Sequence, residues 1–185
     1  MVTPVYYSVS GAQRPLVQLL GRRSGRALPT GNARDLVDGL WVTCVDVGRP
    51  MVLLDGNLLP GSLPEPEPDP ALPLAQHLQE RLERVRLQTG YLMGLGDVMQ
   101  QPVPHMLLVR RCGPAMLLVQ RLDHSGSAVS ASFLNAAAAA CALAWPDSLT
   151  SELLALNSST RLQIRAGQKL YAFGLTGRTG DPSES

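Results

Sequence analysis

The chain has 185 residues, a length typical of one domain, and carries 16 Lys and Arg against 15 Asp and Glu. That balance argues against a general nucleic-acid-binding protein, because such proteins need a clear positive excess to contact phosphates. Three widely spaced cysteines, with no CxxC motif and no histidines at zinc spacing, predict neither a disulfide framework nor a metal site. They favour a reducing, cytoplasmic setting.

The first part of the chain predicts strands and turns. Residues 5–9 are β-like, and residues 12–25 are either a strand or irregular. Residues 28–32 (LPTGN) have the composition of a turn. A β-branched run over 40–47 predicts a strand, and the bend GRP at 48–50 leads into a second strand over 51–54.

A proline-rich stretch over 59–73 predicts an exposed loop, because proline removes backbone donors. The apolar spacing over 74–89 then predicts an amphipathic helix. After it we expect, in chain order, strands at 105–109 and 116–119, an alanine-rich helix over 128–144, a short helix over 149–156, and strands at 162–164 and 170–173. The pattern predicts one α+β domain over 1–175 and a frayed tail over 176–185.

The order of these segments resembles the PrpF family, whose members isomerise or tautomerise unsaturated tricarboxylates such as 2-methylaconitate. The resemblance rests on residues 28–32, 42–52, 82–95 and 104–109, and on the alanine-rich helix that ends at the WPD sequence of 145–147. It implies the diaminopimelate-epimerase fold, in which a curved, mostly antiparallel sheet wraps around a central alanine-rich helix. It also implies chemistry without a cofactor or a metal.

Two departures from the family matter for function. Family enzymes have two similar domains with the active site in the cleft between them, and this chain resembles only the C-terminal half. The first domain's acid/base motif and lysine have no counterpart, and Lys169 is the single lysine of the chain. The resemblance therefore implies that a second copy, or a separate partner similar to the N-terminal domain, would complete the cleft.

The strongest candidate site is the loop before the alanine-rich helix. His124 can exchange protons near neutral pH, and Asp123 is a second candidate for acid/base catalysis. The backbone and hydroxyl donors of Ser125, Gly126 and Ser127 would bind a substrate carboxylate at the start of a helix. The alternative is an ordinary N-capping loop, because Asp and Ser are common caps.

A second candidate is the bend at Gly48 and Arg49, where a guanidinium could bind a carboxylate through two hydrogen bonds. The alternative is a surface arginine in a β-bulge. The turn residues Thr30, Gly31 and Asn32 could line the same cleft, or they could serve only the turn.

These observations predict an isomerase-like protein that moves a proton and a double bond in a small unsaturated carboxylate. One alternative is a non-catalytic half-domain, either a binding module or a relic. Another is the same fold used for a different reaction, such as cyclisation in secondary metabolism. We expect neither a nucleic-acid partner nor a membrane partner, since the most apolar stretch, 136–145, is too short to span a bilayer.

Overall fold

The computed structural model describes residues 5–9, 12–15, 27–58, 76–123, 128–154 and 161–175. Its described strands form a single ten-stranded sheet in the order β2-β1-β10-β9-β7-β6-β5-β4-β3, with β8 paired to β7 beside β9. The strands are β1 (Val5–Val9), β2 (Ala12–Pro15), β3 (Asp35–Val37), β4 (Leu40–Asp46), β5 (Pro50–Asp55), β6 (His105–Gly113), β7 (Met116–Leu122), β8 (Ala128–Val129), β9 (Arg161–Ala166) and β10 (Lys169–Leu175). The pairs β5–β6 and β7–β9 are parallel, and the others are antiparallel.

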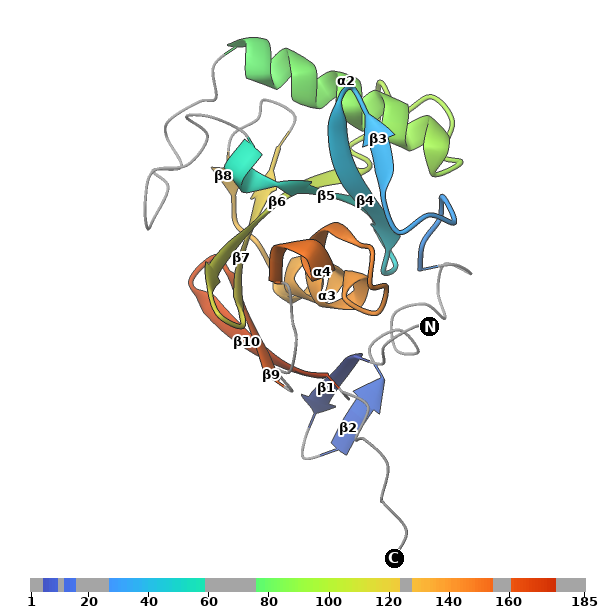
Figure 1. The fold of residues 1–185 in the computed structure, drawn as a ribbon. Helices are drawn as coiled ribbons and strands as arrows, with labels where there is room; N and C mark the ends of the chain where they lie inside the picture. The colour runs from blue at the N-terminus through green and yellow to red at the C-terminus, as the bar shows by residue number, and fades with distance from the viewer. Residues whose placement is uncertain are drawn as a thin grey trace, which may run out of the picture.

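The sheet curves around two helices, α3 (Phe133–Ala142) and α4 (Leu149–Leu154), as Figure 1 shows. Residues Asn135–Ala142 of α3 are all buried, as expected for a helix that is apolar on every side. Alanine side chains are short, so the sheet can approach this helix closely from several directions. The predicted α+β class, with a curved and mostly antiparallel sheet around a central alanine-rich helix, is therefore confirmed.

The outer face of the sheet carries a second core beneath α2 (Gln76–Leu92). Leu78, Leu82 and Val85 of this helix pack against β4, β5 and β6, while a short 3₁₀ helix, η2 (Gly56–Leu58), follows β5. Alternate residues of the central strands enter the two cores: Val42 and Cys44 face α2, whereas Val45 faces α3. The central strands are thus buried on both faces.

The predicted start of the alanine-rich helix is wrong. Ala128 and Val129 form β8 opposite Leu122 and Arg121, and the helix begins only at Phe133. Ser132 is the N-cap and has extended backbone angles. The backbone N–H of Ser132 donates to the side-chain oxygen of Asn135 at 2.8 Å. This local cap stops the helix from extending into 128–131. Sequence analysis also missed β3.

Thr43 joins β4 to α4 in the core. Its hydroxyl donates to the carbonyl oxygen of Ala33 at 2.8 Å and accepts the N–H of Leu149, the first residue of α4, at 2.9 Å. Next to this link, Arg34 forms an ion pair with Glu152 of α4, and its guanidinium lies 5.2 Å from the ring centroid of Trp41. Helix α4 is therefore held by polar contacts as well as by packing.

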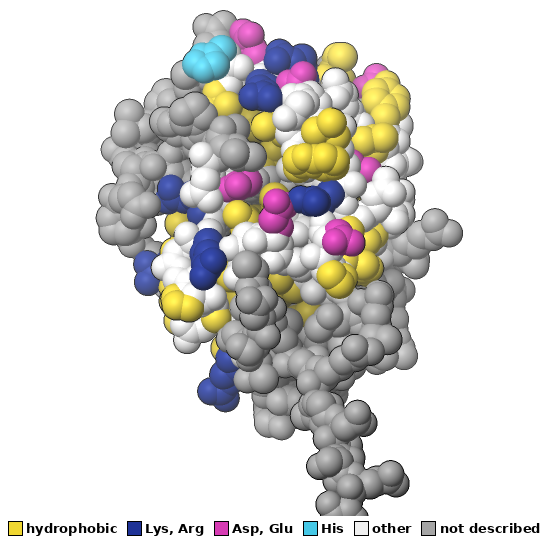
Figure 2. Space-filling view, viewed as in Figure 1, with side chains coloured by type: hydrophobic (Ala, Val, Ile, Leu, Met, Phe, Trp, Pro, Cys, Tyr) yellow, Lys and Arg dark blue, Asp and Glu magenta, His cyan; other side chains and the backbone are white. Residues whose placement is uncertain are grey.

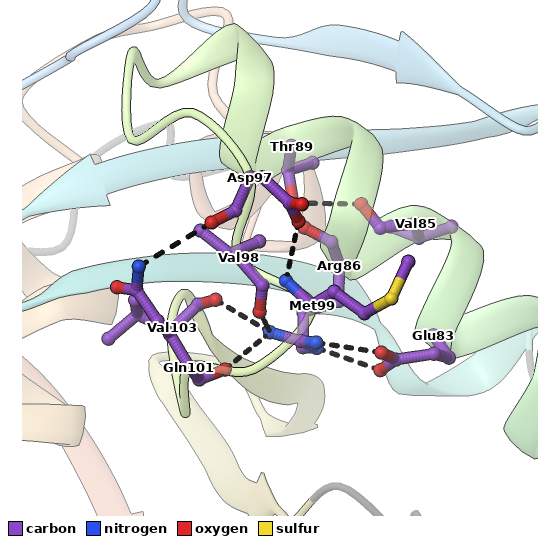
Figure 3. A network of polar contacts seen from close by, with 9 residues as sticks. All are labelled: Glu83, Val85, Arg86, Thr89, Asp97, Val98, Met99, Gln101 and Val103. Atoms are coloured by element: carbon purple, nitrogen blue, oxygen red, sulfur yellow. Dashed lines mark hydrogen bonds and ion pairs between the residues drawn. The ribbon is translucent and has the colours of Figure 1, made fainter.

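Arg86 of α2 is the centre of a network of polar contacts (Figure 3). Its Nε and Nη2 donate to the two carboxylate oxygens of Glu83, each at 2.7 Å. Its Nη1 donates to the carbonyl oxygens of Val98, Gln101 and Val103 at 2.7–3.0 Å. The network fastens the segment between α2 and β6 to the helix, and so fixes where β6 begins.

Within the described residues, no helix combines the length and the apolar character needed to cross a membrane. The predicted proline-rich loop over 59–73 and the predicted tail over 176–185 lie outside the described residues. The domain boundaries therefore stay a prediction.

Candidate functional site

Several chain segments converge at one end of the curved sheet. Met51 of β5 pairs with His105 of β6, and Met106 pairs with Leu122 of β7, so these strands start or finish side by side. Helix α3 starts at the same end, because the side chain of Asn135 donates to the sulfur of Met51 at 3.7 Å. This end of the sheet therefore lies next to the positive end of the α3 dipole.

A groove of about 910 Å³ opens beside the start of α3, between β7, β8 and the β9–β10 hairpin. Leu118 and Val119 face opposite sides of the sheet, yet both line the groove. Both can do so because the pairing of β7 with β9 ends at Val119 and Ala166. Its polar lining residues are Gln120, Ser130, Ser132, Arg165, Gln168, Lys169 and Tyr171.

The charges of this groove have one sign. Arg165 and Lys169 line it, and none of its described lining residues is acidic. The start of α3 adds the partial positive charge of the helix dipole, while the hydroxyl of Ser132 donates to Oδ1 of Asn135 at 3.2 Å. Two cations and a helix start suit an anionic ligand, and the volume suits a small molecule.

Outside the groove, the charge pattern is mixed. On the face shown in Figure 2, basic and acidic side chains are interspersed, with exposed apolar side chains between them. Among the described side chains of that face, the basic groups do not form an extended patch.

The predicted bend lies at this end of the sheet. Gly48 has a φ of +92°, which favours glycine, and its N–H donates to the carboxylate of Asp46 at 2.9 Å. Arg49 next to it is exposed and does not line the groove. Its role as a carboxylate ligand stays a prediction.

The predicted turn residues lie near the bend, since the N–H of Asp46 donates to the carbonyl oxygen of Ala27 at 2.9 Å. Thr30 and Asn32 both donate to the carboxylate of Asp35, at 2.8 and 2.7 Å. Gly31 closes the turn with a φ of +80°. These contacts hold the turn together, and nothing in them places Thr30, Gly31 or Asn32 against a ligand.

Of the predicted catalytic loop, the structure describes only Asp123. It follows β7 directly and lines a small pocket with His105, Arg86 and Arg121. His124, Ser125, Gly126 and Ser127 lie outside the described residues. Because β8 follows this loop, the start of α3 is flanked by Ser130 and Ser132 instead.

Sequence analysis missed two polar residues near the end of β7. Among the buried side-chain nitrogen and oxygen atoms of the described residues, Gln120 Oε1 and Arg121 Nε have no hydrogen-bond partner. They are consecutive residues near the end of β7, and Gln120 is only 7% exposed. A signal was present in the sequence, since a Gln-Arg pair interrupts the otherwise apolar run of β7.

The buried cysteines are not candidates for nucleophilic chemistry. Burial raises the pKa of Cys141 to about 12, and burial together with the negative charge of Asp35 raises the pKa of Cys44 to about 12. Because the thiolate is the reactive form, both thiols stay protonated at neutral pH. Among the described residues, no group of three or more His, Cys, Asp or Glu side chains is placed to hold a metal ion.

Comparison with known proteins gives no matching family model, but it gives relatives and a related structure. The chain is 47% identical over 89 residues to a 4-oxalomesaconate tautomerase of Pseudomonas putida, covering 48% of this chain and 24% of that protein. It is 34% identical over 143 residues to a (4E)-oxalomesaconate Delta-isomerase of Novosphingobium, covering 76% of this chain and 39% of that protein.

The solved structure of a methylitaconate-delta-isomerase matches with a TM-score of 0.66 and 15% sequence identity. The match covers 92% of this chain and 52% of that one. The matched part thus corresponds to between a quarter and about half of the length of these proteins.

The fold therefore defines this chain as an α+β domain of the type found in that isomerase. The resemblance to the PrpF family predicted from the sequence is confirmed, because relatives named as isomerases or tautomerases cover about half to three-quarters of the chain.

Proposed function

We propose that this domain binds a small unsaturated carboxylate and takes part in moving a proton, and with it a double bond, within that molecule. The observation that carries the proposal is the groove at the start of α3, which has Arg165 and Lys169 in its lining and no acidic residue among its described lining residues. The relatives support the reaction type, since their names are those of isomerases and tautomerases.

The chemistry follows from the charge that develops during such a shift. A base removes a proton from the carbon next to the double bond, and the electron pair spreads onto a carboxylate or keto oxygen as an enolate. The cations of the groove and the start of α3 would stabilise that negative charge. The proton then returns at the far carbon. Asp123 and His124 are our candidates for the proton transfers, with no cofactor or metal required.

A second unit would complete the site. The matched proteins are about two to four times as long as the part this chain covers, and large apolar side chains are exposed on the described surface. They are Leu36, Trp41, Tyr91, Leu92, Met99 and Leu170. We propose a second copy of this chain or a separate domain as the partner. Light scattering of the purified protein tests the first option, which a strictly monomeric protein would exclude.

Proton exchange tests the function directly. The protein is incubated with cis-aconitate or mesaconate in D₂O, and proton NMR follows the ligand signals. Loss of the signals of the exchangeable protons supports the proposal. Binding without exchange would favour the alternative, a non-catalytic binding module, and absence of binding would contradict both.

The cellular setting is part of the proposal. Cys44, Cys112 and Cys141 form no disulfide, and this supports the reducing, cytoplasmic location expected from the sequence.

A further inference from the structure

The two buried atoms without a hydrogen-bond partner, Gln120 Oε1 and Arg121 Nε, belong to neighbouring residues of β7. Folded proteins rarely leave such atoms unsatisfied, because each one loses its bonds to water without replacing them. Their position at the end of β7 coincides with the end of the sheet where the groove and the predicted acid/base loop lie.

Arg121 has the stronger requirement for a partner. Its side chain is partly buried, and its buried Nε has no hydrogen-bond partner. Arginine stays charged at any physiological pH, so it cannot reduce the cost of burial by losing a proton. A partly buried charge without a counter-ion destabilises a fold.

The register of the sheet sets the direction of this side chain. Arg121 pairs with Leu107 of β6, and Leu107 belongs to the core around α3. Residues opposite each other in an antiparallel pair face the same side of a sheet, so Arg121 leaves β7 on the side of α3. Gln120 pairs with Leu108 and faces the other side.

Arg121 also lines a pocket of about 50 Å³, together with Arg86, His105 and Asp123. Residues of both faces of the sheet line this pocket, since Met106 and Leu122 belong to the core under α2 and Arg121 leaves the strand on the α3 side. Each of the three guanidinium nitrogens of Arg86 is already engaged, by the Glu83 carboxylate or by three carbonyl oxygens. Arg121, whose buried Nε has no partner, is therefore the better candidate to bind a ligand in this pocket. The pocket has room for one small group, such as a single carboxylate.

We propose that Arg121 binds one carboxylate of the ligand, while the groove at the start of α3 binds the rest of the molecule. The guanidinium would form two parallel hydrogen bonds to that carboxylate, which fixes its orientation as well as its position. Asp123 lines the same pocket, so a carboxylate held by Arg121 would place the adjacent carbon close to a candidate base. This inference rests on the proposed function, because it assigns a residue to the same carboxylate ligand.

The test measures affinity and stability together, using cis-aconitate as the probe. Calorimetric titration compares wild type, Arg121→Met, Arg121→Lys and the control Arg111→Met. Arg111 is an exposed arginine of β6 whose Nε donates to the carbonyl oxygen of Gly113, at the opposite end of the sheet. We expect Arg121→Met to weaken binding by about 10- to 100-fold, since it removes charge-assisted hydrogen bonds. Arg121→Lys should retain part of the affinity, and Arg111→Met should bind as wild type.

Thermal unfolding without ligand distinguishes a binding role from a structural one. An arginine that has no partner in the free protein should leave the melting temperature unchanged or raise it when replaced by methionine. A clear fall in melting temperature of Arg121→Met would show that the arginine supports the fold and would overturn the proposal.

Two failures are separable in this design. If wild type does not bind cis-aconitate, the proposed function fails and the assignment of Arg121 fails with it. If wild type binds and Arg121→Met binds equally well, only the assignment fails. A nitrogen-15 spectrum gives a second readout: one arginine Nε–H signal should shift on ligand addition in wild type, and that signal should be missing from Arg121→Met.

Discussion

Two arginines line the same small pocket and differ in their hydrogen-bond partners. Arg86 is 3% exposed, and it donates to both oxygens of Glu83 and to three carbonyl oxygens (Figure 3). Arg121 has a buried Nε without a partner. The difference teaches that burial of a charge by itself says little about its role. The degree to which its donors are satisfied separates an arginine that builds the fold from one available to a ligand.

The same contrast holds for the regions around them. The segment between α2 and β6 satisfies its polar groups internally, with Thr89 of α2 donating to the carbonyl oxygens of Val85 and Arg86. The end of β7 leaves polar groups unsatisfied next to a groove. Proteins keep such locally unfavourable arrangements mainly where function requires them.

The largest effect should come from Arg86. Replacing it with methionine leaves the Glu83 carboxylate without its partner and removes the donor to three carbonyl oxygens. We expect a loss of about 3–5 kcal/mol in the free energy of unfolding, measured by urea denaturation. The control is Arg84→Met, an exposed arginine of the same helix that lies 3.4 Å from Asp38 and should cost less than about 1 kcal/mol. Equal losses in the two variants would contradict the comparison.

A smaller loss should follow from Gly90→Ala in the same region. A Cβ at Gly90 would lie 2.5 Å from Cγ2 of Val98, which is fully buried. Alanine usually favours a helix, but here the clash should cost about 1–3 kcal/mol. The double variant Gly90→Ala with Val98→Ala should recover part of that loss. If Gly90→Ala instead raised the free energy of unfolding, the segment around Val98 would be able to move away from the added methyl group at little cost.

At the end of β7 the sign should reverse. Gln120→Met removes a buried amide whose Oε1 has no partner and replaces it with an apolar side chain of similar length. We expect a gain of about 1 kcal/mol in the free energy of unfolding. A loss of similar size would mean that Gln120 supports the fold, and the contrast between the two regions would then be limited to the arginines.

The last effect appears only at alkaline pH, and it should be equal on the two faces of the sheet. Cys44 lies in the core under α2 and Cys141 in the core around α3, and each has a pKa raised to about 12. The unfolded thiols ionise near pH 9, so stability should be constant below pH 9 and should fall as the pH rises from 9 to 12. Cys44→Ala and Cys141→Ala should each reduce that slope in denaturation measured at pH 8 and pH 10.5. A slope unchanged in both variants would contradict burial as its cause.

Much of the fold was predictable, and the errors have local causes. The apolar spacing of 74–89 predicted α2 within a few residues of its observed ends, and the β-branched run over 40–47 predicted β4. Strand β3 has only three residues, too few for a period to show. The helix expected over 128–144 began late because Ser132 and Asn135 form a cap, and alanine content alone does not reveal it.

The candidate site was predicted less completely. Sequence analysis put a site between the end of β7 and the alanine-rich helix, and the groove lies in that region. It selected Arg49, which does not line the groove, and did not single out Arg121, our proposed carboxylate ligand, which lines the small pocket and not the groove. A search for motifs and turn residues selects site candidates in loops, whereas Gln120 and Arg121 lie within a strand.

The sequence by itself determined the α+β class, the order of the elements, the burial of the alanine-rich helix and the resemblance to a family of isomerases. These properties depend on local composition and on spacing along the chain. Only the tertiary structure decided which polar groups are satisfied, because the partners come from distant positions. Arg86 finds carbonyl oxygens 12 to 17 residues away, and Thr43 bonds the N–H of Leu149, 106 residues away. Arg86 differs from Arg121 through those long-range contacts and through its local ion pair with Glu83.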